Sequence, residues 1–205
     1  LIKFLENIET KKYSKSIVTI IREHKDNIVD YYHTYGASLC TGKYIWIMGN
    51  DCKCLTDSWD EKMLKLFEEH ENKHKDGIMI AFPSDNIIDP NQNLPDENFF
   101  SCYSVLSKRF FEVTGIFNPR ETEAWGGDYW LNIIFKTLKH LGYERVVNCR
   151  NVRLKVSGVH VGDKDEVPDG TSFMHRISKV QALTGEQVHD YCKVIIDYIE
   201  LFKKN

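Results

Sequence analysis

The sequence contains no apolar run that approaches the roughly 20 residues needed for a membrane-spanning helix. It also lacks the basic-then-apolar start of a secretory signal peptide, an internal repeat and a low-complexity segment. Its 27 lysines and arginines do not outnumber its 30 aspartates and glutamates, so the basic excess typical of nucleic-acid-binding domains is missing. We therefore expect a cytoplasmic protein with no transmembrane segment and no nucleic-acid partner.

The six cysteines fit no common zinc motif. Cys52 and Cys54 are closer together than in a zinc knuckle, and no second pair accompanies them. We interpret all six as reduced thiols, as is usual in a cytoplasmic protein. With 205 residues, of which 42% are hydrophobic, the chain is long enough for one domain with a sizeable core.

Short apolar runs and helical patterns alternate along the chain. Strands are predicted over residues 16–21, 44–48, 77–83, 99–106, 144–149 and 152–158. Helices are predicted over residues 30–39, 58–74, 107–114, 125–142 and 188–202, the last within a C-terminal helical segment, 173–205. Ser58 and Glu61 suggest a capping box, and Gly142 a left-handed cap. This alternation predicts an α/β fold, with ligands beyond the carboxyl ends of the strands.

Three acidic or basic side chains follow predicted strands or begin a helix. Asp51, after Gly49 and Asn50, suits a hard cation such as Mg²⁺ or Mn²⁺, although Gly-Asn-Asp is also ordinary turn chemistry. Asp128 begins an apolar helix, where an acid is also favoured by the helix dipole alone. His160 stands between glycines after the last predicted strand, and a lone histidine is often structural. Together the three could hold one divalent metal and supply one base.

The order of these motifs resembles that of the GT-A nucleotide-sugar glycosyltransferases, in particular the family-2-like inverting group. The stretch GASLCTGKYIWIMGNDC is similar to the family's small-residue helix and the strand that ends in its acidic DxD metal motif. TGIFNPRETEAWGGDYWL supplies Gly115, Phe117 and Asp128 for the segment whose last carboxylate is the family's base. Gly142-Tyr143 and His160 complete the series, and the resemblance covers about residues 16 to 162.

The resemblance implies a GT-A type α/β/α sandwich with a mostly parallel, Rossmann-like central sheet, formed by a single domain over residues 1–205. It also implies transfer of a sugar, with inversion, from a nucleoside-diphosphate sugar to a hydroxyl of a glycan or other acceptor. Asp51 and His160 would bind Mn²⁺ or Mg²⁺, which assists departure of the diphosphate. Asp128 would be the general base, and the substrate would contact Asn50, Trp125, Gly126 and Gly127.

The sequence departs from the family pattern at several points. Asn50 replaces a carboxylate of the metal motif, and Gly127 replaces the glutamate that often precedes the base. We also expect the family's first strand to be missing, because nothing upstream of Leu1 corresponds to it, and the acid that reads the nucleotide base has no counterpart. Two other functions therefore stay open: a sugar-phosphate nucleotidyltransferase, and a non-catalytic sugar- or nucleotide-binding domain.

Overall fold

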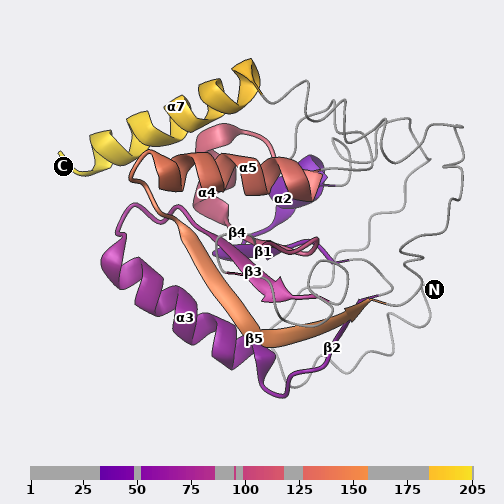
Figure 1. The fold of residues 1–205 in the computed structure, drawn as a ribbon. Coiled ribbons are helices and arrows are strands. Elements are labelled where there is room, and N and C mark those ends of the chain that lie inside the picture. The colour runs from indigo at the N-terminus through magenta and orange to yellow at the C-terminus, as the bar shows by residue number, and fades with distance from the viewer. Residues whose placement is uncertain are drawn as a thin grey trace, which may run out of the picture.

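The computed structural model describes residues 33–48, 52–85, 95, 99–117, 127–156 and 185–204. Five strands in this part of the chain form one sheet in the order β1-β4-β3-β5-β2 (Figure 1). Their bounds are β1 Tyr44–Trp46, β2 Cys52–Cys54, β3 Ile80–Ser84, β4 Val105–Ser107 and β5 Val146–Val156. The helices are α2 Tyr35–Leu39, α3 Trp59–Lys73, α4 Lys108–Thr114, α5 Gly127–His140 and α7 Glu186–Phe202.

The direction of the strands differs from the prediction. Within the described residues, β1–β4, β3–β4 and β2–β5 pair antiparallel, and only β3 and β5 run parallel. The predicted GT-A type sandwich with a mostly parallel, Rossmann-like sheet is therefore wrong. The sheet is small and mixed, mostly antiparallel, and curled into a half-barrel.

The bend in β5 accounts for much of this curl. Pro83 of β3 pairs with Cys149, but the next residue, Ser84, pairs with Arg153, so the register shifts between them. A bulge of this kind bends a strand and increases its twist. Beyond it, β5 pairs with β2, which lies at the edge of the sheet. The two strands predicted over 144–149 and 152–158 are thus one bent strand (Figure 1).

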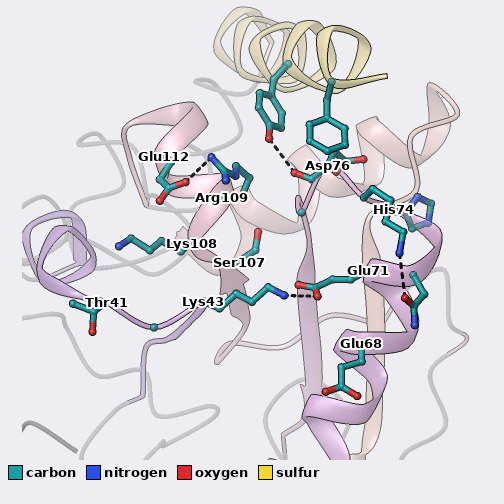
Figure 2. Close-up of a pocket in the computed structure, with 16 residues that line it drawn as sticks. Thr41, Lys43, Glu68, Glu71, His74, Asp76, Ser107, Lys108, Arg109 and Glu112 are labelled. Atoms are coloured by element: carbon teal, nitrogen blue, oxygen red, sulfur yellow. Dashed lines mark hydrogen bonds and ion pairs between the residues drawn. The ribbon is translucent and has the colours of Figure 1, made fainter. Parts of the chain in front are cut away.

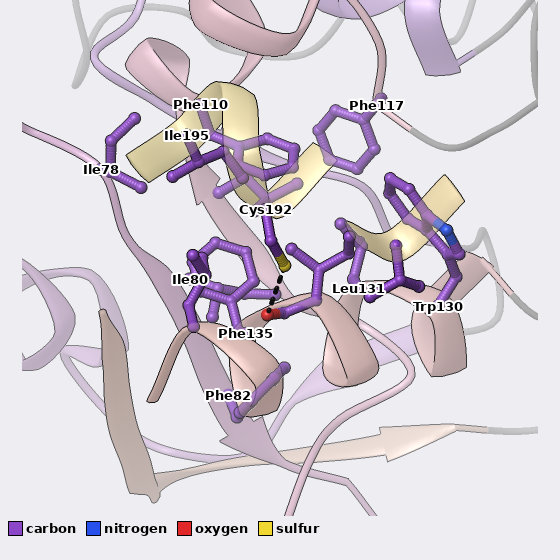
Figure 3. Packing of buried hydrophobic residues seen from close by; sticks show 14 of the residues in the cluster. Ile78, Ile80, Phe82, Phe110, Phe117, Trp130, Leu131, Phe135, Cys192 and Ile195 are labelled. Atoms are coloured by element: carbon purple, nitrogen blue, oxygen red, sulfur yellow. Dashed lines mark hydrogen bonds between the residues drawn. The ribbon is translucent and has the colours of Figure 1, made fainter. Parts of the chain in front are cut away.

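Every residue of β3 is buried, because helices cover both faces of the sheet at this strand. Met79 and Ala81 belong to a cluster with Met63 and Phe67 of α3. The alternate residues Ile78, Ile80 and Phe82 face the other helices. Figure 3 shows Ile80 beside aromatic and aliphatic side chains of α4, α5 and α7. Each fully buried side chain of this size contributes roughly 1.5–3 kcal/mol to folding.

Capping residues explain the start of α4 and the end of α5, whereas the cap predicted for α3 is absent. Ser107 is extended, and its hydroxyl accepts a hydrogen bond from the N–H of Phe110, which caps α4. Gly142 follows α5 with a φ of +88°, as the predicted left-handed cap requires. The predicted capping box at Ser58 is wrong: Ser58 has a φ of +50°, and its side chain makes no cap hydrogen bond to α3.

Asp76 and Arg145 form a buried ion pair where the chain enters β3 and β5. The Arg145 Nη2 donates to Asp76 Oδ2 at 2.8 Å, and its Nε donates to Oδ1 at 3.2 Å. The N–H of Ile78 also donates to Oδ1, and the Tyr198 hydroxyl of α7 donates to the Asp76 carbonyl. Both charged side chains are only 6% exposed. The pair therefore holds the starts of the two parallel strands together.

We expect Asp76→Ala to lower the free energy of unfolding by about 3–5 kcal/mol, because it leaves the Arg145 guanidinium buried without its carboxylate. Urea denaturation would measure the change. Asp197→Ala is the matched control, since Asp197 pairs with Lys193 on the exposed surface of α7, where an ion pair contributes little. Equal losses in the two variants would contradict a special role for the buried pair.

Candidate functional site

A group of buried polar side chains lies beyond the carboxyl end of β3. Asp85 directly follows this strand and is 2% exposed. Its Oδ2 accepts one hydrogen bond from the Ser101 hydroxyl and another from the N–H of Cys102, each at 2.8 Å. The Ser101 Oγ in turn accepts from the N–H of Tyr103 at 3.1 Å. These bonds attach the turn that precedes β4 to the end of β3.

Asp128 joins this group from the first turn of α5. Its partly buried carboxylate is near the Cys102 thiol, the backbone N–H of Tyr129 and the carboxylate of Asp85. Burial raises the pKa of Asp128 above its usual value, the nearby Cys102 thiol and backbone N–H groups oppose this rise, and the nearby charge of Asp85 adds to it. Asp128 therefore binds a proton more readily than an ordinary surface aspartate.

Cys102 is close to both carboxylates. Burial raises the pKa of its thiol, and the charges of Asp128 and Asp85 raise it further. The thiol consequently keeps its proton at neutral pH, which makes it a poor nucleophile. None of the six cysteines forms a disulfide.

The structure describes two of the predicted site residues and leaves the others outside its described part. Gly127 and Asp128 form the start of α5, as predicted, with Gly127 buried. Asn50, Asp51, Trp125, Gly126 and His160 lie outside the described residues. Asp85 and Cys102 were not predicted. An aspartate two residues after the apolar run 77–83, at the end of a predicted strand, is the signal that could have identified Asp85.

The predicted metal site stays a prediction. Among the described residues, no group of three or more His, Cys, Asp or Glu side chains is arranged to hold a metal ion. Both proposed ligands, Asp51 and His160, lie outside this part of the chain. In the same residues, no helix is sufficiently long and apolar to cross a membrane.

A second feature lies at the opposite end of β3, near Asp76. It is a hollow of about 770 Å³ between the residues before β1, the end of α3 and the start of α4 (Figure 2). Its charges are largely paired, because Lys43 binds Glu71 and Arg109 binds Glu112. Four acidic and four basic side chains line it, so the hollow carries no excess charge that would favour a nucleoside diphosphate. The acidic residues are Glu68, Glu71, Asp76 and Glu112, and the basic residues are Lys43, Lys75, Lys108 and Arg109.

Two histidines lie near the buried ion pair, and one of them, His74, also lines the hollow. The rings of His70 and His74 are 4.6 Å apart. Burial lowers the pKa of His70 to about 4, and the proximity of His74 and Arg145 contributes to the decrease. Burial likewise lowers the pKa of His74. The folded protein therefore holds His70 neutral at a pH where an unfolded chain would protonate it.

No family model, curated protein or solved structure shows significant similarity to this chain. The assignment of a function consequently rests on the residues of the site and on the order of the motifs.

We expect the free energy of unfolding to fall as the pH is lowered from about 6.5 towards 4. In this range the unfolded chain takes up a proton at His70, whose ordinary pKa is 6.5, while the folded chain, with a pKa of about 4, does not. Urea denaturation across this range would show a shallower fall in His70→Gln than in the wild type. His189→Gln is the control, because His189 is exposed on α7. An unchanged slope in His70→Gln would contradict the prediction.

Proposed function

We propose that the protein is a glycosyltransferase that uses a nucleoside-diphosphate sugar, with Asp128 as the general base. The observation that carries this proposal is the position of Asp128 beside Asp85 and Cys102, beyond the carboxyl end of β3. β3 and β5 are the parallel pair of the described sheet, and β4, α4 and α5 lie between them in the chain. The carboxyl ends of parallel strands are where ligands commonly bind in α/β sheets.

The chemistry of Asp128 suits the transfer of a sugar to a hydroxyl. The acceptor oxygen forms a bond to the anomeric carbon while the bond from that carbon to the diphosphate oxygen breaks. Asp128 takes the proton that the acceptor oxygen loses, and attack from the face opposite the diphosphate inverts the anomeric centre. The acceptor is a glycan or another molecule with a hydroxyl group. A base of this kind contributes about 10²- to 10⁴-fold to the rate.

The remaining machinery of the proposal comes from the motifs. A Mn²⁺ or Mg²⁺ ion bound by Asp51 and His160 would neutralise the charge that develops on the departing diphosphate. Asn50, Trp125, Gly126 and Gly127 are the proposed contacts to substrate. Asp128 is the residue for which both the motif and the surroundings in the structure favour a role.

We expect Asp128→Asn to reduce turnover of a nucleotide sugar by about 10²-fold or more, because an amide has the shape of the carboxylate but cannot take the proton. The assay is release of nucleoside diphosphate from a panel of nucleotide sugars, with Mn²⁺ present. Binding of the nucleoside diphosphate, followed by calorimetry, should change little. Asp190→Asn, on the exposed surface of α7, is the matched control.

Other outcomes identify the alternative functions. Wild-type turnover in Asp128→Asn would contradict the assignment of the base. Release of pyrophosphate from a nucleoside triphosphate and a sugar phosphate would indicate a nucleotidyltransferase. Binding of nucleotide sugars without any turnover in the wild type would indicate a non-catalytic binding domain.

A further inference from the structure

We propose that His70 and His74 bind one divalent transition-metal ion, such as Cu²⁺ or Zn²⁺, at the carboxyl end of α3. Both histidines belong to the described part of the chain. The site uses neither Asp51 nor His160, the residues predicted to hold Mn²⁺ or Mg²⁺, and it goes beyond the proposed transfer of a sugar.

The spacing of the two histidines places them on one face of the helix. They are the first and last residues of the sequence HENKH, residues 70–74. α3 ends at Lys73 and His74 is its C-cap, with its N–H donating to the His70 carbonyl at 2.9 Å. Side chains four residues apart along a helix are neighbours. This is the spacing at which one helix supplies two histidines to a metal in the His-Glu-x-x-His pattern.

The two rings are close enough to share an ion. Their centroids are 4.6 Å apart, and their planes are inclined by 41°. A metal about 2.0–2.1 Å from an imidazole nitrogen lies about 3.2 Å from the centroid of that ring. At the observed separation the two rings therefore subtend about 90° at the ion, the angle between adjacent ligands in the square-planar sites of Cu²⁺. Tetrahedral Zn²⁺ needs centroids about 5.2 Å apart, so the rings would separate slightly to bind it.

His70 has a ring nitrogen that the described residues leave without a hydrogen bond. Its Nε2 is buried and has no partner among them. A buried polar atom of this kind needs an explanation, and an ion that is absent from the structure supplies one. The ring also lies near the backbone of Ile78, the kind of group that fixes the second nitrogen of a ligating histidine.

The surroundings of the pair give an ion access and do not repel it strongly. His74 lines the hollow of about 770 Å³, which is large enough for the water molecules that complete the coordination of the ion. Arg145 is the nearby cation, but Asp76 neutralises it through two hydrogen bonds. Because burial lowers the pKa of both His70 and His74, both rings are neutral at neutral pH, the state that binds metals.

The glutamate of the HENKH sequence serves another contact. Glu71 accepts from the Lys43 ammonium through Oε2 and from the Tyr44 hydroxyl through Oε1, and Figure 2 shows it directed towards Lys43. In peptidases with the His-Glu-x-x-His pattern, the glutamate is instead the general base beside the metal. The site is therefore a metal-binding site of two histidines and water, and not a hydrolytic centre.

The test is a titration of the metal-free protein with Zn²⁺, followed by ¹H–¹⁵N NMR of the histidine rings. The chain has 8 histidines, and the signals of His70 and His74 are assigned from their loss in His70→Gln and His74→Gln. We expect these two rings to shift together, with one shared midpoint. Mg²⁺ should shift neither ring, because it binds oxygen ligands.

Two ligands of one ion depend on each other, whereas two separate surface histidines do not. His74→Gln should therefore raise the Zn²⁺ midpoint of His70 by about tenfold or more, since loss of even an outer-shell partner costs a metal site 10- to 100-fold. His189→Gln, at an exposed position on α7, is the matched control and should leave it unchanged. A wild-type His70 midpoint in His74→Gln would overturn the proposal. If that variant does not fold, different midpoints for the two rings in the wild type overturn it instead.

Asp51→Ala separates this site from the predicted Mn²⁺ or Mg²⁺ site. It should leave the shared Zn²⁺ midpoint of His70 and His74 unchanged, and loss of that midpoint would overturn the proposal. The titration does not involve nucleotide sugars. A protein that binds Zn²⁺ at the two histidines but turns over no nucleotide sugar would retain the metal site and lose the glycosyltransferase assignment, and the reverse result would do the opposite.

Discussion

The complete burial of β3 is the constraint on which the rest of the described structure depends. Hydrophobic clusters pack against both of its faces, with α3 on one side and α4, α5 and α7 on the other. A strand in this position has no room for an unpaired polar side chain, because burial of such a group is costly. The charged residues of this region therefore lie just before and just after the strand, where each is met by several hydrogen-bond donors.

The two ends of β3 use an aspartate for different purposes. Before the strand, Asp76 is paired with Arg145, so its charge is neutralised and its effect is on stability. After the strand, Asp85 accepts hydrogen bonds from Ser101 and Cys102 and faces a second carboxylate, Asp128. Two acids that face each other raise the proton affinity of one of them, which is a common arrangement at catalytic sites. This contrast is why we propose the functional site at the end near Asp85, although a hollow lies near Asp76.

Features that depend on neighbouring residues could be predicted from the sequence. The helices near residues 59–73, 108–114, 127–140 and 186–202 follow local periodicity, with local caps at Ser107 and Gly142, and Asp128 was identified because it starts an apolar helix. Strand direction could not be predicted, since an apolar run such as Tyr44–Trp46 has the same pattern in either orientation. Its antiparallel pairing with Val105–Ser107 depends on contacts distant in sequence. Asp85 was missed for the same reason: its donors lie 16 and 17 residues further along the chain.

The central claim is that substrate chemistry takes place where Asp85, Cys102 and Asp128 meet. The most direct measurement is a crystal structure of the protein grown with Mn²⁺ and a nucleoside diphosphate. We expect the diphosphate to bind beyond the carboxyl end of β3, next to Asp128. A nucleotide bound instead in the hollow between α3 and α4, beside Lys43 and Arg109, would contradict it.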